Sequence, residues 1–375
     1  MKRNIFDNAR GEKRIFKDER YLYPEFVPER LSHRDSEINS LVYAFNPVAK
    51  GGKPHNVFVT GATGTGKTVS VKYVLNELEE YSDRAKKLYL NCFEYNSRHA
   101  ILSKIANFLG APIPRRGLAT DEIYSKMLEA MKKVDFFPII ILDEIDQIMN
   151  ITESSNLLYD LLRVIEYQRN RFGLAIISND PSFTSKLDSR VKSSLAEEKV
   201  VFNPYTPIQI KDILKERANY AFQGDALNEE VIPVAAAHAA KRGGDARVAI
   251  EALWKAGREA ERENAGKVEL KHLKMAFEIV DSVSALKHVK ELDDNEKAVL
   301  KIIAELSPIA SGDLYEKYCA SEKEPLSQRR VSEFVTNLEK RNLVSAALIS
   351  MGNKGKTRQI SLTAPKDAVL KELTD

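Results

Sequence analysis

The segment from His55 to Thr68 constrains the fold of this chain more than any other feature of its sequence. An apolar run leads into the pattern Gly-x-x-x-x-Gly-Lys-Thr, and valines at helical spacing follow it. In such a segment the glycines turn backbone N–H groups toward phosphates, the lysine reaches the β and γ oxygens, and the threonine hydroxyl can bind magnesium. The start of the helix adds its positive end. We therefore predict a nucleotide phosphate site, the phosphate loop, formed by Gly61, Ala62, Thr63, Gly64, Thr65, Gly66, Lys67, Thr68 and Val69.

Short apolar runs alternate with helical patterns between residue 55 and about residue 205. This alternation predicts an α/β fold, in which crossover helices connect the strands of a parallel sheet. The runs are almost entirely apolar, as expected for strands that are buried on both faces. The predicted strands are His55–Gly61, Lys87–Cys92, Phe136–Asp143, Gly173–Asn179 and Lys199–Phe202.

Beyond Pro204 the pattern changes twice. Thr206-Pro207 is typical of a helix start, and helical patterns continue to about Val289, which predicts an all-helical unit. Three helices and a β-hairpin, the pattern of a winged helix, follow from Leu292. Their predicted bounds are Asp293–Leu306, Ser311–Tyr318, Ser327–Arg341, Leu343–Ser350 and Lys356–Leu362. We expect three domains, at residues 1–205, 206–290 and 291–375.

Length and composition exclude several classes of protein. A chain of 375 residues, 43% hydrophobic and 30% charged, has room for two or three globular domains. No run approaches the ~18 apolar residues of a membrane span, and no apolar signal core follows Met1. The two cysteines, Cys92 and Cys319, form neither a disulfide framework nor a metal-binding pattern. We expect a soluble, cytoplasmic protein without a membrane partner.

Carboxylates follow the third predicted strand. The run that begins at Phe137 ends in Asp143-Glu144-Ile-Asp146, at the edge of the sheet where open α/β folds bind ligands. Acidic residues after a strand are often only solvated. About 75 residues after a phosphate loop, however, Asp143 is expected to hold magnesium together with Thr68, and Glu144 to polarise the attacking water.

Three further polar residues are candidates for sensing the nucleotide. Asn179 follows the fourth predicted strand and could bind the water or the γ-phosphate; alternatively, it forms a turn before Asp-Pro. Arg190 either lies in solvent or reaches a neighbouring subunit's γ-phosphate. Gly243-Gly244 is typical of a helix end and Asp245 of the N-cap of the next helix, which places Arg247 in the first turn of that helix. It either points into the nucleotide cleft or pairs with a neighbouring acid, and the sequence leaves both open.

Basic charge is concentrated near the C-terminus. The chain carries a net charge of +3, whereas residues 326–358 carry seven basic and two acidic residues, a local charge of +5. Winged helices that contact DNA place the third helix in the major groove and the hairpin against the backbone or the minor groove. The alternative is a winged helix that contacts protein. The candidate DNA-binding residues here are Gln328, Arg329, Arg330, Ser332, Lys354, Lys356 and Arg358.

Taken together, these segments resemble the AAA+ ATPases over nearly the whole chain. They resemble more narrowly the archaeal origin-recognition and replication-initiator family, homologous to eukaryotic origin recognition complex subunit 1 and cell division control protein 6. The narrowing segments are Phe16–Arg20, Tyr23–Arg34, the phosphate loop, the acidic residues from Asp143, Ser189–Leu195 and Gly244–Arg247. The resemblance implies that Val27, Pro28 and Arg34 surround the adenine. It also implies that Asn179 is sensor 1, Arg190 the arginine finger and Arg247 sensor 2.

The same resemblance implies partners and an activity. Arg115 and Arg116 would belong to an initiator-specific insertion that touches DNA. ATP or ADP with Mg²⁺ would be the cofactors, and hydrolysis would be slow. The partners would be double-stranded origin DNA, a replicative helicase of the minichromosome maintenance type and paralogous initiators. The protein would act at the nucleoid. Two positions depart from the family pattern, Ala62 in place of lysine and Ser189 in place of proline. The rival hypotheses are an ATP-gated transcriptional regulator and a clamp-loader-like or transposition-helper ATPase.

Overall fold

The computed structural model describes residues 14–114, 117–148, 151–167, 172–195, 198–290, 292–322, 324–341, 343–350, 356–364 and 366–374. The chain divides into two compact units. The first holds Asp18–Ala221 and Ile232–Ile250, and it contains the phosphate loop. The second holds residues 14–17, 222–231 and the described part of the chain from 251 onward.

A five-stranded parallel sheet forms the centre of the first unit. Its order is β2-β3-β4-β1-β5, and every neighbouring pair runs parallel. The strands are β1 (Val57–Gly61), β2 (Ala85–Asn91), β3 (Phe137–Asp143), β4 (Gly173–Ser178) and β5 (Glu198–Phe202). All five strands expected from the sequence are confirmed, with ends shifted by two residues at most. The central strands β1, β3 and β4 are almost wholly buried, whereas the edge strands β2 and β5 expose residues because each has one neighbour only.

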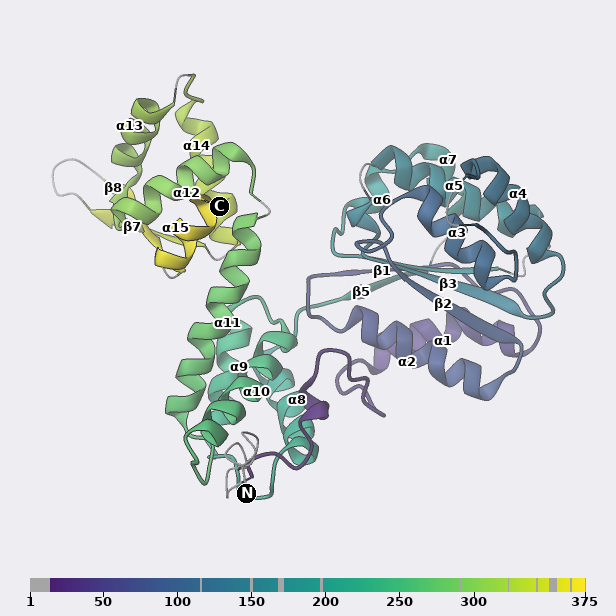
Figure 1. Ribbon diagram of the computed structural model, residues 1–375, viewed down its shortest axis with the longest axis horizontal. Helices are drawn as coiled ribbons and strands as arrows, with labels where there is room; N and C mark the ends of the chain where they lie inside the picture. The colour runs from purple at the N-terminus through teal and green to yellow at the C-terminus, as the bar shows by residue number, and fades with distance from the viewer. Residues whose placement is uncertain are drawn as a thin grey trace, which may run out of the picture. The chain divides into compact units, whose positions relative to one another are not determined.

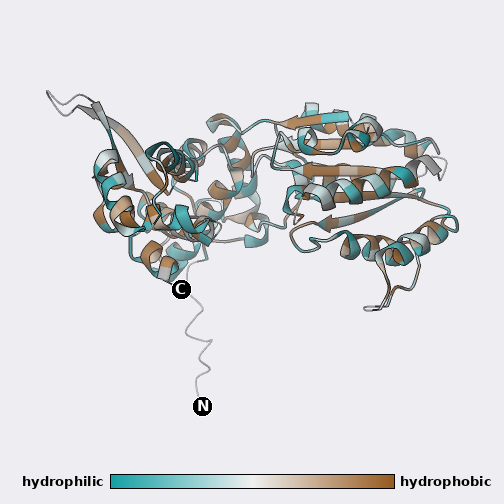
Figure 2. Ribbon diagram, turned by 90° about the horizontal axis from the view of Figure 1, so that it is seen from above, coloured by the Kyte–Doolittle hydropathy of each residue, from teal (hydrophilic) through white to brown (hydrophobic). Residues whose placement is uncertain are grey.

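Helices cover both faces of this sheet (Figure 1). One face packs on α1 (Asp35–Ala49) and α2 (Lys67–Tyr81) around a core that includes Phe45 and Val71. The other face packs on the helices between β2 and β5, around a core that includes Leu102 and Leu161. These helices are α3 (Arg98–Phe108), α4 (Thr120–Met131), α5 (Ile151–Tyr167), α6 (Phe183–Lys186) and α7 (Ser189–Leu195). Figure 2 shows the apolar strands enclosed between helices that alternate in hydropathy, as expected for helices with one buried face.

Four helices follow β5: α8 (Pro207–Ala221), α9 (Val231–Lys241), α10 (Ala246–Arg262) and α11 (Leu270–Lys290). The predicted start at Thr206-Pro207 is confirmed. The Thr206 hydroxyl accepts a hydrogen bond from the Gln209 N–H at 3.3 Å, and the Gln209 side chain accepts one from the Thr206 N–H at 2.9 Å, which is a reciprocal cap.

The C-terminal part of the second unit is a winged helix. It contains α12 (Asp294–Leu306), α13 (Ser311–Ser321), α14 (Gln328–Lys340), β7 (Val344–Ser350) and β8 (Lys356–Leu362). Two elements were missed from the sequence, β6 (Ile309–Ala310) and α15 (Lys366–Thr374). The sheet order is β6-β8-β7, with antiparallel pairs. Helix α15 closes this domain, since Val369 lies in its core. The turn expected at residues 351–355 lies outside the described residues.

None of the helices in the described ranges combines the length and the apolar character that crossing a membrane requires.

Candidate nucleotide site

The phosphate loop connects the buried strand β1 to α2 at the carboxyl edge of the sheet. Gly64 (φ +73°) and Gly66 (φ +92°) adopt left-handed conformations that side chains disfavour. At Gly64 there is no room for a side chain either, because a Cβ would lie 1.7 Å from Asp245 Oδ1. The loop is therefore held close to the turn that precedes α10.

Lys67 is buried at the base of the loop, and its ammonium group donates three hydrogen bonds. The acceptors are the Gly61 carbonyl at 2.9 Å, the Ala62 carbonyl at 2.8 Å and Asn179 Oδ1 at 2.8 Å. Burial lowers the pKa of Lys67, and the nearby Asp143 carboxylate opposes this shift. The structure thus brings together two residues that the sequence placed in one site, although 112 positions separate them.

Ala62 uses its backbone in this site, and its side chain is exposed. Its carbonyl accepts from Lys67 and from the Thr65 hydroxyl at 2.8 Å. Any residue supplies this carbonyl. The geometry therefore explains why alanine is compatible with the loop where the family pattern has lysine.

Asp143 is only 3% exposed and accepts three hydrogen bonds. Its Oδ2 accepts from the Thr68 hydroxyl and from the Tyr89 hydroxyl, both at 2.8 Å, and its Oδ1 accepts from the Glu144 N–H at 3.0 Å. Thr68 and Asp143 offer the oxygen ligands that magnesium prefers. Throughout the described ranges, no group of three or more His, Cys, Asp or Glu side chains is arranged to hold a metal ion.

Tyr89 was not identified from the sequence. It lies on the edge strand β2, and Lys72 Nζ lies 3.6 Å from the centre of its ring. Burial, followed by the Asp143 charge, raises the pKa of Tyr89 far above its ordinary value, so the phenol stays protonated and donates a hydrogen bond to Asp143. A tyrosine on a strand is ordinary, and no local pattern marked it.

Glu144 and Asp146 play different parts at the end of β3. Glu144 has a left-handed backbone (φ 55°), an uncommon conformation for a residue with a side chain. Asp146 Oδ1 accepts from the Ser178 hydroxyl at 2.7 Å and from the Asn179 N–H at 3.0 Å. Asp146 thereby fixes the backbone at Asn179. The sequence marked it as a carboxylate at the strand end but gave it no role.

Arg247 pairs with a neighbouring acid, one of the two alternatives that the sequence left open. Its guanidinium donates to Asp245 Oδ1 at 3.3 Å and to Asp245 Oδ2 at 3.0 Å. It is nevertheless close to the loop, because its partner Asp245 lies against Gly64. From there its charge adds to the larger effect of burial in lowering the pKa of Lys67. The adjacent Ala246 N–H donates to the Gly64 carbonyl at 3.4 Å.

Arg190 lies at the start of α7 with 71% of its side chain exposed. Its backbone N–H and its Nε both donate to Asp188 Oδ1, at 2.9 and 3.1 Å. Its expected role as an arginine finger stays a prediction.

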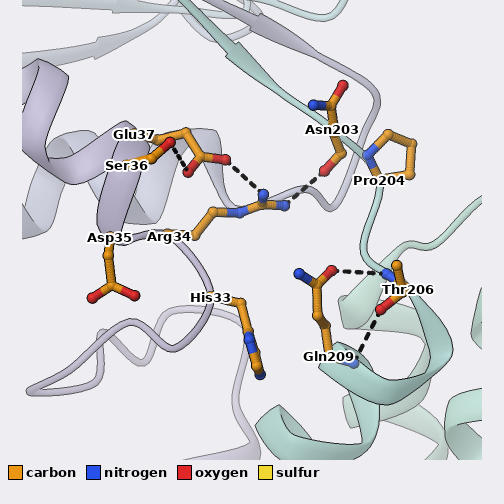
Figure 3. Close-up of a pocket in the computed structure, with 9 residues that line it drawn as sticks. All are labelled: His33, Arg34, Asp35, Ser36, Glu37, Asn203, Pro204, Thr206 and Gln209. Carbon is orange, nitrogen blue, oxygen red and sulfur yellow. Dashed lines mark hydrogen bonds and ion pairs between the residues drawn. The ribbon is translucent and has the colours of Figure 1, made fainter.

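Figure 3 shows a pocket of about 520 Å³, and one of its lining residues, Arg34, contacts Thr65 of the loop. Its lining residues are His33, Arg34, Asp35, Ser36, Glu37, Asn203, Pro204, Thr206 and Gln209. Of the three residues expected around the adenine, Arg34 lines this pocket, whereas Val27 and Pro28 are half-buried and do not. The Arg34 guanidinium points between Glu37 and Asn203.

The expected DNA-binding side chains of α14 lie at the surface. Arg329 is 90% exposed, and both it and Arg330 form ion pairs with Glu333. Gln328 and Ser332 are exposed on the same helix. On the hairpin, Arg358 pairs with Glu339 at 3.0 Å, and Lys356 begins β8. Arg115, Arg116 and Lys354 lie outside the described residues.

The sheet order, the phosphate loop after β1, the acid after β3 and the amide after β4 define an AAA+ domain. Family models agree over most of the chain: an AAA domain matches residues 52–184, the Cdc6 AAA+ ATPase-type lid domain matches 211–278, and the CDC6 C-terminal winged helix domain matches 288–372. These matches confirm the expected architecture of an α/β ATPase domain, a helical lid and a winged helix.

Curated relatives and a solved structure narrow the class further. The chain is 38% identical to the ORC1-type DNA replication protein of Thermococcus kodakarensis, over 96% of this chain and 91% of the relative. It is 35% identical to ORC1-type DNA replication protein 1 of Archaeoglobus fulgidus, over 99% of this chain and 94% of the relative. The Aeropyrum pernix ORC1 protein, solved in complex with DNA, matches with a TM-score of 0.75 and 34% identity over 97% of each chain. This chain belongs to the ORC1/Cdc6 family of DNA replication initiators.

Proposed function

We propose that this protein is an ATP-dependent replication initiator that binds double-stranded DNA at origins and helps to recruit or load the replicative helicase. Two hydrogen bonds at one edge of the sheet carry the proposal. The Lys67 ammonium group donates to Asn179, and the Thr68 hydroxyl donates to Asp143. Lysine, metal-ligand and amide groups from three strand ends converge there, as phosphoryl transfer on a bound nucleotide requires.

Each residue has a defined part in this proposal. The loop backbone and Lys67 bind the β and γ phosphates. Thr68 and Asp143 would hold a magnesium ion, whose charge offsets that of the phosphates. Glu144 orients the attacking water, and Asn179, held by Asp146, reports on the γ-phosphate.

Arg247 supports a nucleotide switch. If Arg247 released Asp245 and paired with the γ-phosphate instead, Asp245 would lose this partner. The turn that contains Asp245 touches Gly64 and leads into α10, so the conformation of this turn would change. Hydrolysis is slow in this proposal because Arg190 acts on the nucleotide of another subunit. The functional domains are residues 1–205 for nucleotide, 206–290 for the lid and 291–375 for DNA.

The winged helix supplies the DNA contact. α14 presents Arg329 and Arg330 at the surface, and a relative at 34% identity was solved in complex with DNA. Phosphate contacts by such residues make binding strongly dependent on salt. Paralogous initiators and a helicase of the minichromosome maintenance type are further proposed partners.

Calorimetric titration with ADP and ATP tests the nucleotide part. Lys67→Ala should abolish binding, because it removes the cation that three acceptors hold in place. Lys104→Ala is the matched control, since this lysine lies on α3 against the Tyr95 ring and should leave affinity unchanged. Undiminished affinity in Lys67→Ala would remove the phosphate-site assignment.

A further inference from the structure

Arg34 is a cation buried behind the phosphate loop. Only 4% of it is exposed, and each nitrogen of its guanidinium bonds a different part of the first unit. Nε donates to the Thr65 carbonyl at 3.0 Å, Nη2 to the Asn203 carbonyl at 2.7 Å, and Nη1 to Glu37 Oε1 at 2.7 Å. One side chain thus joins the phosphate loop, the segment after β5 and the first turn of α1.

An aromatic ring completes this contact. The Arg34 Cζ lies 3.9 Å from the centre of the Tyr205 ring, and Tyr205 is itself buried. The Tyr205 hydroxyl lies 2.7 Å from the position that a Cβ on Gly66 would take. Arg34 and Tyr205 therefore contact the two residues that immediately precede Lys67.

The residues before Arg34 connect to α8. The Ser32 hydroxyl donates to Glu216 Oε2 at 2.8 Å, and His33 Nε2 lies 3.1 Å from Asp212 Oδ2. His33 has a left-handed backbone (φ 63°), and its side chain points away from the Arg34 guanidinium (Figure 3). Residues 32–34 thus link α8 to the phosphate loop through three successive side chains, two that contact α8 and one that contacts the loop.

We propose that Arg34 is a positioning residue for the nucleotide site, which shapes the phosphate loop and ties it to the Asn203–Tyr205 segment. This inference rests on the proposed nucleotide binding by the loop. Arg34 donates to two carbonyls and a carboxylate that lie around its planar guanidinium. Arginine reaches all three because its donors form a rigid fork, whereas the single ammonium group of lysine does not. A displacement of Thr65 is consequently transmitted through Arg34 to Asn203, which begins the segment between β5 and α8.

Arg34→Lys tests this role through two measurements. The first is amide hydrogen exchange of a peptide that covers the loop, measured without nucleotide. It should become faster, because a lysine ammonium cannot hold the Thr65 carbonyl together with Asn203 and Glu37 as the guanidinium does. The second is ADP affinity, which should fall about tenfold or more, as expected for the loss of hydrogen bonds to a charged donor. Glu37→Gln keeps Arg34 and weakens only its carboxylate partner, so it should shift both measurements in the same direction by less.

Arg98→Lys is the matched control. Arg98 lies in the same unit, pairs with Asp160 at 2.5 Å and Asp121 at 3.3 Å, and belongs to α3. It should leave loop exchange and ADP affinity unchanged within about twofold. An equal effect in this control would show general destabilisation and overturn the positioning role.

Two other results would overturn the proposal. Unchanged loop exchange together with weaker ADP binding in Arg34→Lys would mean that Arg34 contacts the nucleotide directly. Unchanged values of both quantities would mean that Arg34 has no role in the site. If the wild-type protein fails to bind ADP, the proposed function fails; the exchange comparison is made without nucleotide and still decides whether Arg34 shapes the loop.

Discussion

Removing the Tyr89 hydroxyl isolates one support of the proposed magnesium site. Tyr89→Phe keeps the ring against which Lys72 packs but deletes the hydrogen bond to Asp143 Oδ2. Asp143 keeps the Thr68 hydroxyl and the Glu144 N–H as donors. The substitution therefore loosens the carboxylate without unfolding the strand.

The magnitude follows from the charge of the acceptor. A hydrogen bond to a charged group contributes about 1.5–3 kcal/mol. Because two donors remain and the site relaxes around them, the lower end applies, and about 1.4 kcal/mol is a factor of ten in a binding constant. We expect affinity for ADP with magnesium to fall about tenfold, and affinity in EDTA to change by less than about twofold, since the loop and Lys67 are untouched.

Calorimetric titration with ADP, with and without magnesium, measures this difference. Tyr124→Phe is the matched control, because it removes a hydroxyl that donates to the Asp160 carbonyl at 3.3 Å in the same unit. Equal losses with and without magnesium in Tyr89→Phe would refute the reasoning, since they would place the effect on the loop instead of on Asp143.

Four other substitutions have defined outcomes. Gly64→Ala places a Cβ against Asp245 in a left-handed backbone, so ADP affinity measured by calorimetry should fall by at least about tenfold; wild-type affinity would contradict this clash. Glu144→Gln should bind ATP normally while phosphate release drops by about a hundredfold or more, and an unaltered rate would exclude its catalytic role. Arg329→Ala should weaken duplex binding and lower the salt slope by about 1, whereas Glu333→Gln should strengthen binding, both measured by anisotropy over a salt series; an unchanged slope in Arg329→Ala would favour a winged helix that contacts protein.

Much of the fold could be predicted because its signals are local. The phosphate loop has a fixed spacing, and the buried strands are short apolar runs between turn residues. The winged helix followed from three helical patterns and a hairpin. The convergence of Lys67, Asp143 and Asn179 followed from one rule, that the carboxyl ends of parallel strands meet at one edge of the sheet.

The rest depends on contacts between distant residues. Tyr89 meets Asp143 across 54 positions, and Arg34 meets Thr65 across 31 positions, with no local pattern for either pair. The two-residue strand β6 is too short to give a period, and it exists because β8 offers a free edge. Helix α15 was missed because its apolar residues have a place only in the finished core of the winged helix.

The positions that the protein occupies on its own chromosome test the central claim most directly. Chromatin immunoprecipitation of the native protein, compared with a map of where new DNA strands begin, should show its strongest sites at the replication start points. Strong sites at promoters, with none at replication start points, would contradict an initiator and favour an ATP-gated regulator of transcription.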